Sequence, residues 1–493
     1  MTSPSRSLPP RALPRSTPAE QGADPAAITA FLDAVEGRPD IEMHSLMVVR
    51  HGQVIAAGWW APYSADRRHL LYSLSKSFTS TAAGLARAEG LLDLDDPVVR
   101  HFPEFEADIT DPGSRAILVR HVAAMASGHD REMAGEARQR DPDEPVRGFL
   151  LIPPDQPPGT VFAYSQPCTY TLASIVQRNA GATLTEYLRP RLFDPLGIGP
   201  VGWQTWPPGR QQGFSGLFAR TEDIAKLGLL YLQGGRWDGR QLLPADWVAQ
   251  ATSKQVDNPD REWTDWRQGY GFQFWMARHG YRGDGAFGQF CVVLPEQDTV
   301  VASTAYTLDM PGVLDALWEH LLPGLGAGAG RPPATDQAQQ QLTARLAGLT
   351  LPAACGDPAP DDWVSWTGDP FSIISERSAT IPVKPAIGSA AVTRDGDGWG
   401  LRIAEPGNAL TFAVGSGAWA VSTPADAQGQ TIPVAASGGW DGPDRLHVEV
   451  IFLETPHRMD LTLYRPGRAG TASWRNPPLG DQALDYFCCP PEA

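Results

Sequence analysis

The 493-residue chain is longer than a single hydrophobic core usually supports, since such cores stop growing near about 250 to 300 residues, so two or more domains are expected. A 42% hydrophobic and 9% aromatic content excludes a globally disordered protein. The formal net charge of −16, with no run of lysine or arginine, argues against a nucleic-acid or membrane surface, and we expect a small-molecule or peptide partner instead.

The first segment, residues 1–22, is rich in Ser, Pro and Arg and lacks the apolar stretch of an export signal. We therefore expect a disordered leader and a cytoplasmic protein. No later stretch approaches the ~18 uninterrupted apolar residues of a membrane-spanning helix. Five cysteines are too few for a disulfide framework in so long a chain, and no metal-ligand spacing occurs, so neither a metal nor a cofactor is expected.

A first domain is predicted over residues 23–323. Its pattern begins with a helix over 25–35 and a hairpin over 45–60 that turns at His51 and Gly52. A helix then starts at Ser73 and stops at Gly90. Further helical patterns cover 119–126, 170–178, 184–192, 221–232 and 244–251, and strand patterns cover 270–277, 289–294 and 299–304. Strands at both ends with helices between them predict one sheet flanked by a helical lobe.

A linker with one short helix, over 336–346, is predicted for residues 324–360 because it opens with the run GLGAGAGRPP. Residues 361–493 change to short strands and predict a separate β-barrel or sandwich. Its expected strands cover 400–404, 410–414, 446–454 and 459–464. The sequence DGDG over 395–398 resembles part of a calcium loop, but its place between strands favours a hairpin turn.

One pair of residues in the first domain could form an activated nucleophile. Ser73 and Lys76 are three positions apart at a helix start, so their side chains share one face of the helix. The amine can accept and relay the hydroxyl proton. Lysine is rare in this chain, which has only Lys76, Lys226, Lys254 and Lys384. Taken alone, the pair is also compatible with an ordinary helix cap.

The sequence around this pair, LYSLSKSFTSTAAGLARAEGLLDLDDPV (71–98), resembles the signature of class C β-lactamases, DD-peptidases and family VIII esterases. The resemblance covers about residues 19–323 and implies a β-lactamase/transpeptidase-like α/β domain without a cofactor. It continues through ILVRHVAAMASGH (117–129), PPGTVFAYSQPCTYTLASIV (157–176), GLFARTEDIAKLGLLYLQGGRWDGRQLLPADWV (216–248) and GDGAFGQFCVVLPEQD (283–298).

The second motif of these families, Tyr-x-Asn, corresponds to Tyr164-Ser165-Gln166. The resemblance implies that Tyr164 is a general base and acid. A phenol can be a base near neutral pH only if a cation favours the phenolate, and Lys76 is the candidate. The alternative for Tyr164 is a packed aromatic side chain. Gln166 keeps an amide that could bond the substrate carbonyl, but it is one methylene longer than asparagine.

The third motif, Lys-Thr-Gly or His-x-Gly on an edge strand, aligns with Gly283-Asp284-Gly285 and has lost its basic residue. Arg282 or His279 could replace its charge, but we expect each of them to be solvated. The small residues would let the backbone approach the substrate, so Asp284 and Gly285 are predicted to line its site. The amides of Ala286 and Ser73 are predicted to form the oxyanion hole.

These motifs predict a serine hydrolase that forms an acyl-enzyme on Ser73 with a neutral ester or amide. Loss of the motif cation weakens the case for β-lactamase activity. A 6-aminohexanoate-dimer-hydrolase-like amidase is one form of this hypothesis. A second hypothesis is acyl transfer, because the chain also resembles stand-alone penicillin-binding-protein-type peptide cyclases, which append a lipocalin-like domain. A third is a non-catalytic binding protein with a degenerate site.

The C-terminal domain is expected to shape substrate access, because its sequence holds no pair comparable to Ser73 and Lys76. Arg445, Arg458 and Arg465 could contact a substrate carboxylate, although a solvated surface role is expected for each of them.

Overall fold

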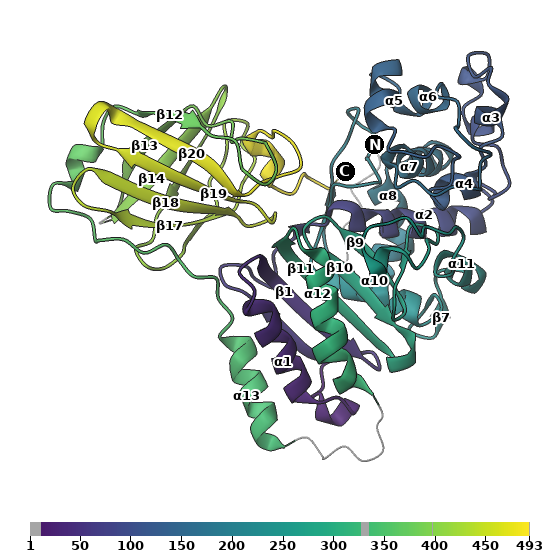
Figure 1. Ribbon diagram of the computed structural model, residues 1–493, viewed down its shortest axis with the longest axis horizontal. Helices are drawn as coiled ribbons and strands as arrows, with labels where there is room; N and C mark the ends of the chain where they lie inside the picture. Colours follow the sequence, from purple (N-terminus) through teal and green to yellow (C-terminus); the bar gives the residue numbers. More distant parts are fainter. Residues whose placement is uncertain (1–10, 327–334, 397, 493) are drawn as a thin grey trace. The chain divides into compact units, whose positions relative to one another are not determined.

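The computed structural model describes residues 11–326, 335–396 and 398–492, which form two compact units (Figure 1). The first unit extends to Gly58, resumes over Leu71–Ala347 and includes the last residues from Pro490. The second unit, called the barrel unit here, combines Trp59–Leu70 with Gly348–Cys489. In the described parts of the chain, no helix is both long enough and apolar enough to cross a membrane.

A six-stranded sheet in the order β2-β1-β11-β10-β9-β8 forms the centre of the first unit. The predicted hairpin and the two late strands are confirmed. The predicted strand over 270–277 is wrong in extent, because Tyr270 forms only isolated bridges, to Val256 and Trp275. The strands are β1 (Ile41–Arg50), β2 (Gln53–Trp59), β8 (Trp275–Met276), β9 (Tyr281–Gly285), β10 (Gln289–Leu294) and β11 (Thr299–Thr307).

Helices pack on this sheet and form the predicted lobe beside it (Figure 1). Helices α1 and α10 contact the sheet, whereas α7 packs against α2 and α4. Each helix predicted from the sequence is present; the one over 221–232 has the predicted bounds, and the others have shifted ends. The longer ones are α1 (Pro25–Glu36), α2 (Ser75–Ala88), α7 (Gln166–Ala180) and α10 (Thr221–Leu232); the shorter ones include α4 (Val119–Ala123), α5 (Ala134–Arg140), α6 (Pro145–Leu150), α8 (Leu184–Leu188), α11 (Ala245–Ala251) and α12 (Met310–Ala316).

The expectation of a disordered leader is wrong for residues 11–22, while residues 1–10 lie outside the described part. Arg15 forms a bridge with Val54 of β2, and the Ser16 amide donates to the Val54 carbonyl at 3.1 Å. Leu13 is buried. The leader is ordered here because β2 is the edge of the sheet, and its free backbone groups bind the incoming segment.

The end of the first unit also differs from the predicted boundary at 323. Helix α13 (Asp336–Ala347), expected within the linker, belongs to the first unit, and its Arg345 pairs with Glu36 of α1. The Leu325 carbonyl accepts a hydrogen bond of 2.6 Å from Arg50 of β1. The glycine-rich run itself falls largely on residues 327–334, outside the described residues.

The barrel unit confirms the all-β prediction. Nine strands form one sheet in the order β15-β14-β13-β12-β20-β19-β18-β17-β16. Gly415, which follows β15, forms a bridge with Ser437 of β17, so the two ends of the sheet approach each other and the barrel is nearly closed. Its interior is filled by buried apolar side chains, including Trp366, Trp399 and Trp440. The strands are β12 (Phe371–Ser375), β13 (Ser389–Asp395), β14 (Gly398–Glu405), β15 (Asn408–Ala413), β16 (Ala420–Ser422), β17 (Val434–Trp440), β18 (Arg445–Phe452), β19 (Arg458–Tyr464) and β20 (Ala469–Asn476).

Strands β13 and β14 pair through Asp395 and Gly398, which confirms the hairpin turn predicted for the DGDG sequence. Of the three arginines considered as substrate contacts, Arg445 pairs with Asp441 and Arg465 with Asp444 on the surface. The expectation of a solvated role is wrong for Arg458, which is buried.

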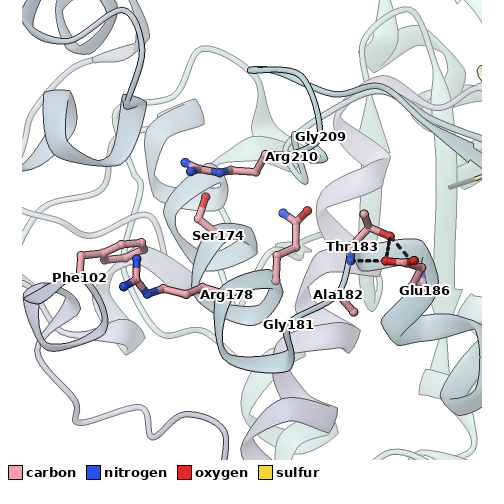
Figure 2. Close-up of a pocket in the computed structure, with 10 residues that line it drawn as sticks. Phe102, Ser174, Arg178, Gly181, Ala182, Thr183, Glu186, Gly209 and Arg210 are labelled. Atoms are coloured by element: carbon pink, nitrogen blue, oxygen red, sulfur yellow. Dashed lines mark hydrogen bonds between the residues drawn. The ribbon is translucent and has the colours of Figure 1, made fainter. Parts of the chain in front are cut away.

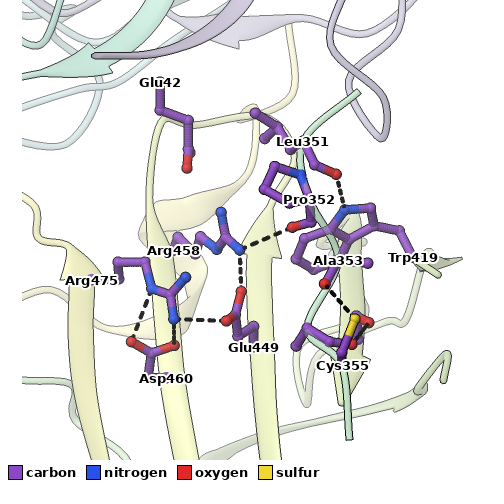
Figure 3. Close-up of polar contacts among 12 residues, drawn as sticks. Glu42, Leu351, Pro352, Ala353, Cys355, Trp419, Glu449, Arg458, Asp460 and Arg475 are labelled. Carbon is purple, nitrogen blue, oxygen red and sulfur yellow. Dashed lines mark hydrogen bonds and ion pairs between the residues drawn. The ribbon is translucent and has the colours of Figure 1, made fainter. Parts of the chain in front are cut away.

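Arg458 belongs to a polar cluster on β18, β19 and β20 (Figure 3). Glu449 pairs with Arg458 and, at 2.7 Å, with Arg475, which also pairs with Asp460 at 2.9 Å. Burial tends to raise the pKa of Glu449, but hydrogen bonds from His447 and Arg458 and the charges of both arginines lower it to about 2. The cluster is therefore a neutralised ion network.

The short segment Trp59–Leu70 joins the barrel unit although it lies early in the chain. The Ala61 amide donates to the Leu349 carbonyl at 3.0 Å, and the Tyr63 hydroxyl donates to the Thr455 carbonyl at 3.0 Å. The Leu70 amide donates to the Glu454 carbonyl at 2.8 Å. The backbone is thus bound to the barrel unit until directly before Leu71.

Candidate active site

Ser73 lies in a 3-10 turn, Tyr72–Leu74, and the regular helix α2 begins only at Ser75. The helix was predicted to start at Ser73, two residues too early. Tyr72 has a φ of 48°, a left-handed conformation that costs energy for a bulky residue. Ser75 holds the turn in place, because its hydroxyl donates to the Tyr72 carbonyl at 2.6 Å and accepts from the Leu217 amide at 3.0 Å. Ser73 itself remains partly exposed.

The predicted pair is in contact. Lys76 Nζ is 3.0 Å from Ser73 Oγ, 2.7 Å from Gln166 Oε1 and 2.8 Å from the Phe214 carbonyl oxygen. Lys76 is 1% exposed. Burial lowers its pKa to about 7, and the charges of Glu132 and Asp284 oppose that shift. Near neutral pH the amine can therefore lose its proton, and its lone pair then faces the Ser73 hydroxyl.

Tyr164 lies beside the same two residues. Its ring centre is 4.9 Å from Lys76 Nζ, and its ring stacks on Trp275 with centres 5.2 Å apart. Burial raises the pKa of the phenol well above its usual range, Asp284 raises it further, and a hydrogen bond with Ser73 opposes them only in part. The expected phenolate, favoured by Lys76, is not supported by these surroundings. Tyr164 is suited to donate a proton.

Gln166, predicted to bond a substrate carbonyl, directs its side-chain oxygen at Lys76 instead. Its longer side chain reaches the amine, which explains how glutamine can occupy this position. The backbone N–H of Gln166 donates a hydrogen bond of 3.0 Å to the Glu132 carboxylate, and the backbone N–H of Ala134 donates one of 2.7 Å to the same group. Glu132 was missed by sequence reasoning because it lies outside all three motifs. It adds an exposed negative charge close to Lys76.

The glycines of the third motif lie where strand β9 passes the nucleophile turn. A Cβ on Gly283 would lie 2.4 Å from Ser77 Oγ, and one on Gly285 would lie 2.1 Å from the Leu71 carbonyl oxygen. Small residues are therefore required by the packing of β9 against the turn that carries Ser73. Approach of a substrate, the reason first given for them, is not needed to explain their size.

Ala286 begins the tight turn after β9, and its carbonyl accepts a hydrogen bond of 2.9 Å from Gln289 Nε2. The same side chain donates to the Ala305 carbonyl at 2.8 Å, so the turn is fixed to β11. Because Gly285 packs on the nucleophile turn, Ala286 and Ser73 belong to the same region. The oxyanion hole formed by their amides stays a prediction.

Arg282 corrects a second expectation, since it is completely buried and not solvated. Its Nε lies 3.2 Å from Asp284 Oδ2, and its guanidinium lies 4.2 Å from the ring centre of Trp266. Asp284 is also buried. The cation near the third motif is thus neutralised inside the protein. His279, by contrast, is exposed as expected.

A separate cavity of about 450 Å³ lies along α7 (Figure 2). Two of its lining residues are arginines, but Arg178 pairs with Glu104 and Arg210 with Glu144. Neither arginine therefore offers an uncompensated charge. The cavity is lined by Phe102, Ser174, Gln177, Arg178, Gly181, Ala182, Thr183, Glu186, Gly209 and Arg210, and so by none of the three predicted catalytic residues.

Comparisons with known proteins identify the family of this chain and several of its relatives. The model of the family described as Beta-lactamase matches residues 31–321. The chain is 28% identical over 326 residues to the 6-aminohexanoate-dimer hydrolase of Paenarthrobacter ureafaciens, covering 60% of this chain and 81% of that relative. It is 27% identical over 216 residues to Esterase EstB of Burkholderia gladioli, covering 38% of this chain and 54% of the esterase.

The crystal structure of SurE resembles nearly the whole chain. The similarity covers 89% of this chain and 99% of that one, with a TM-score of 0.50 and 18% sequence identity. At this identity the similarity concerns the fold alone.

Proposed function

The chain belongs to the beta-lactamase family, whose members similar to it include hydrolases of esters and amides, and on this basis we propose that it is a serine hydrolase acting through an acyl-enzyme on Ser73. One observation carries the proposal. Lys76 is buried, has a pKa near 7 and is bonded at once to Ser73, Gln166 and Phe214. This is an arrangement for moving a proton at a serine hydroxyl.

In acylation, the neutral amine of Lys76 donates its two N–H groups to Gln166 Oε1 and the Phe214 carbonyl. Its lone pair accepts the hydroxyl proton of Ser73 while Oγ attacks the substrate carbonyl carbon. The new C–O bond places a negative charge on the carbonyl oxygen. The amides of Ser73 and Ala286 are the proposed donors to that oxygen.

Collapse of the tetrahedral intermediate breaks the bond to the leaving group, which needs a proton. Tyr164 supplies it, because its phenol stays protonated in these surroundings, and the Lys76 ammonium returns a proton to Tyr164. In deacylation, Tyr164 and Lys76 accept a proton from the attacking water, and Lys76 returns a proton to Ser73 Oγ as the acyl bond breaks. The net reaction is hydrolysis of an ester or an amide to an acid and an alcohol or amine.

The substrate is proposed to be neutral near the scissile carbonyl. The basic residue of the third motif is absent, and the nearby Arg282 is neutralised by Asp284. Aromatic rings surround Tyr164: Trp275 stacks on it, and Tyr270 and Phe162 contact that indole edge-on. Phe162 and Tyr164 are partly exposed, and these two rings favour an apolar acyl group, since aromatic surfaces bind apolar groups without a charge.

A fluorophosphonate probe and a neutral aryl ester test the proposal. Wild-type protein should gain one probe mass on Ser73 and release the aryl alcohol. Ser73→Ala and Lys76→Ala should each lose nearly all turnover, and the double variant should be no worse than either, because the two residues act as one unit. A folded wild-type protein that neither takes up the probe nor cleaves the ester would favour the non-catalytic alternative.

Acyl transfer uses the same acyl-enzyme and differs only in the nucleophile that resolves it. Adding an amine to a peptidyl ester or thioester assay measures the ratio of transfer to hydrolysis. Amide product in excess of free acid would identify the chain as an acyltransferase that retains Ser73, Lys76 and Tyr164 in the roles proposed above.

A further inference from the structure

We propose that Asp284 is a positioning residue of the Ser73 site, held by Arg282 and Trp275, and that it acts on Lys76 through its charge and on Tyr164 through the Trp275 indole. This inference rests on the proposed function, because it assigns roles within the same site. It assigns a role to Asp284, the carboxylate in the altered third motif.

Asp284 is held rigidly. It is 7% exposed and pairs with Arg282, which is 0% exposed. The guanidinium is itself fixed from three sides: Nη1 donates to the Asp265 carbonyl at 3.0 Å, the Trp266 ring lies 4.2 Å from Cζ, and Nε faces Asp284. Within the described residues, Arg282 Nη2 is buried without a hydrogen-bond partner. So costly an arrangement needs a function, because burying an ion pair seldom stabilises a fold.

The route to Tyr164 runs through Trp275. Burial raises the pKa of Asp284, and the charge of Arg282 and a hydrogen bond from the Trp275 side chain oppose that shift. The hydrogen bond joins the indole to the carboxylate. The Tyr164 ring stacks on the same indole, with an angle of 20° between the two ring planes. Tyr270 closes the group with edge-on contacts to both rings. Asp284 therefore sets the orientation of the ring whose hydroxyl bonds to Ser73.

The route to Lys76 is electrostatic. The charges that face the amine are those of Glu132 and Asp284, and those that face the Tyr164 hydroxyl are Asp284, Glu132 and Arg261. Both carboxylates favour the protonated forms of Lys76 and Tyr164. Glu132 is exposed and is screened by salt, whereas Asp284 is buried and is screened much less. At high salt the effect of Glu132 on Lys76 should therefore weaken more than the effect of Asp284.

The scarcity of lysine permits a direct measurement that needs no catalysis. With 13C at the lysine Cε atoms, the four lysines give four signals, and the Lys76 signal is the one absent from Lys76→Ala protein. Its titration is followed at high salt in wild type and in Asp284→Asn, which keeps the shape and removes the charge. The Lys76 midpoint should fall by about one pH unit, as expected for loss of one nearby opposite charge.

Asp315→Asn is the matched control, because Asp315 is an exposed partner of Arg278. It should leave the midpoint unchanged. An unchanged Lys76 midpoint in folded Asp284→Asn protein would overturn the inference. Asp284→Asn could fail to fold because the buried Arg282 loses its carboxylate. The double variant Arg282→Met/Asp284→Asn then removes this buried charge as well. The Lys76 midpoint should fall in this protein too, because it also lacks the charge of Asp284.

The positioning of Tyr164 is tested by aryl-ester kinetics of Trp275→Phe, which keeps an aromatic ring and removes the indole N–H. The expected result is a lower kcat with little change in KM, and Asp284→Glu should retain more activity than Asp284→Asn. A rise in KM at constant kcat would show that Trp275 only binds substrate. Failure of the proposed function is a separate outcome, seen as absence of probe on Ser73, while the lysine titration still reports on Asp284.

Discussion

Lys76 Nζ lies closer to Gln166 Oε1, at 2.7 Å, than to Ser73 Oγ, at 3.0 Å. The amide oxygen and the Phe214 carbonyl together use the two hydrogens of a neutral amine, which leaves its lone pair for the serine. The hydrogen bond to Gln166 thus orients the Lys76 amine so that its lone pair faces Ser73.

Gln166→Leu removes this acceptor at nearly constant size. Acylation by an aryl ester should slow by roughly 100-fold, at the lower end of what a positioned general base contributes. The measurement is the single-turnover rate of aryl alcohol release. Gln250→Leu, a partly exposed position on α11, is the control and should react at the wild-type rate. A wild-type rate in Gln166→Leu would mean that Phe214 alone orients the amine.

The pH profile should report Lys76. Because the amine must be neutral to accept the Ser73 proton, kcat/KM should rise as pH rises through about 7 and reach a plateau above it. Tyr164→Phe should lower the plateau while the rising limb keeps its midpoint, since the raised pKa of the phenol places its ionisation far above this range. A rising limb that disappears in Tyr164→Phe would identify the tyrosine as the base.

Lys76 should also make stability depend on pH. Its folded-state pKa, about 7, is below the ordinary value of 10.5, so between these values the unfolded chain binds a proton that the folded protein lacks. The contribution of Lys76 to the free energy of unfolding therefore becomes more favourable to the folded state as pH rises from about 7 to 10.5. Lys76→Met should unfold at a higher temperature at pH 7 and lose that slope. A thermal scan at pH 7 measures the unfolding temperature, and urea unfolding at several pH values measures the slope.

Gly285→Ala should disturb the nucleophile turn, because its Cβ would lie 2.1 Å from a backbone oxygen that cannot move aside easily. We expect lower thermal stability and loss of probe labelling at Ser73. Gly135→Ala on α5 is the matched control, since nothing lies within 4 Å of its Cβ and alanine favours a helix. Equal behaviour of the two variants would contradict the packing argument.

In the barrel unit, Glu449→Gln should destabilise the fold by about 3 kcal/mol, because it removes the buried carboxylate that pairs with both Arg458 and Arg475. Asp441→Asn, which removes the exposed partner of Arg445, should change the unfolding free energy by less than about 0.5 kcal/mol. Chemical denaturation followed by tryptophan fluorescence compares them. The Glu449 contribution should be lost as pH falls from about 4.5 to about 2, as the folded-state carboxylate becomes protonated.

The sequence predicted those features that follow local rules. Alternating apolar residues identified β10, β11, β18 and β19, and the Ser73 and Lys76 spacing identified a contact that the structure contains. Each of these depends on residues close together in the chain.

The errors concern tertiary surroundings. Arg282 was expected in solvent because arginine is usually exposed, but the rings of Trp266 and Trp275 and the carboxylate of Asp284 enclose it. Tyr164 was expected to ionise because Lys76 was treated as a full cation. Burial weakens that cation, and no spacing in the sequence reports burial of this kind.

Residues Trp59–Leu70 also impose an order on biosynthesis. Tyr63 emerges from the ribosome long before its partner Thr455, which follows 392 residues later. Contacts so distant in sequence form late and slowly. The backbone that leads into Ser73 therefore lacks these barrel-unit contacts until Thr455 has been translated, so a nascent chain that ends before this residue should have a less reactive serine.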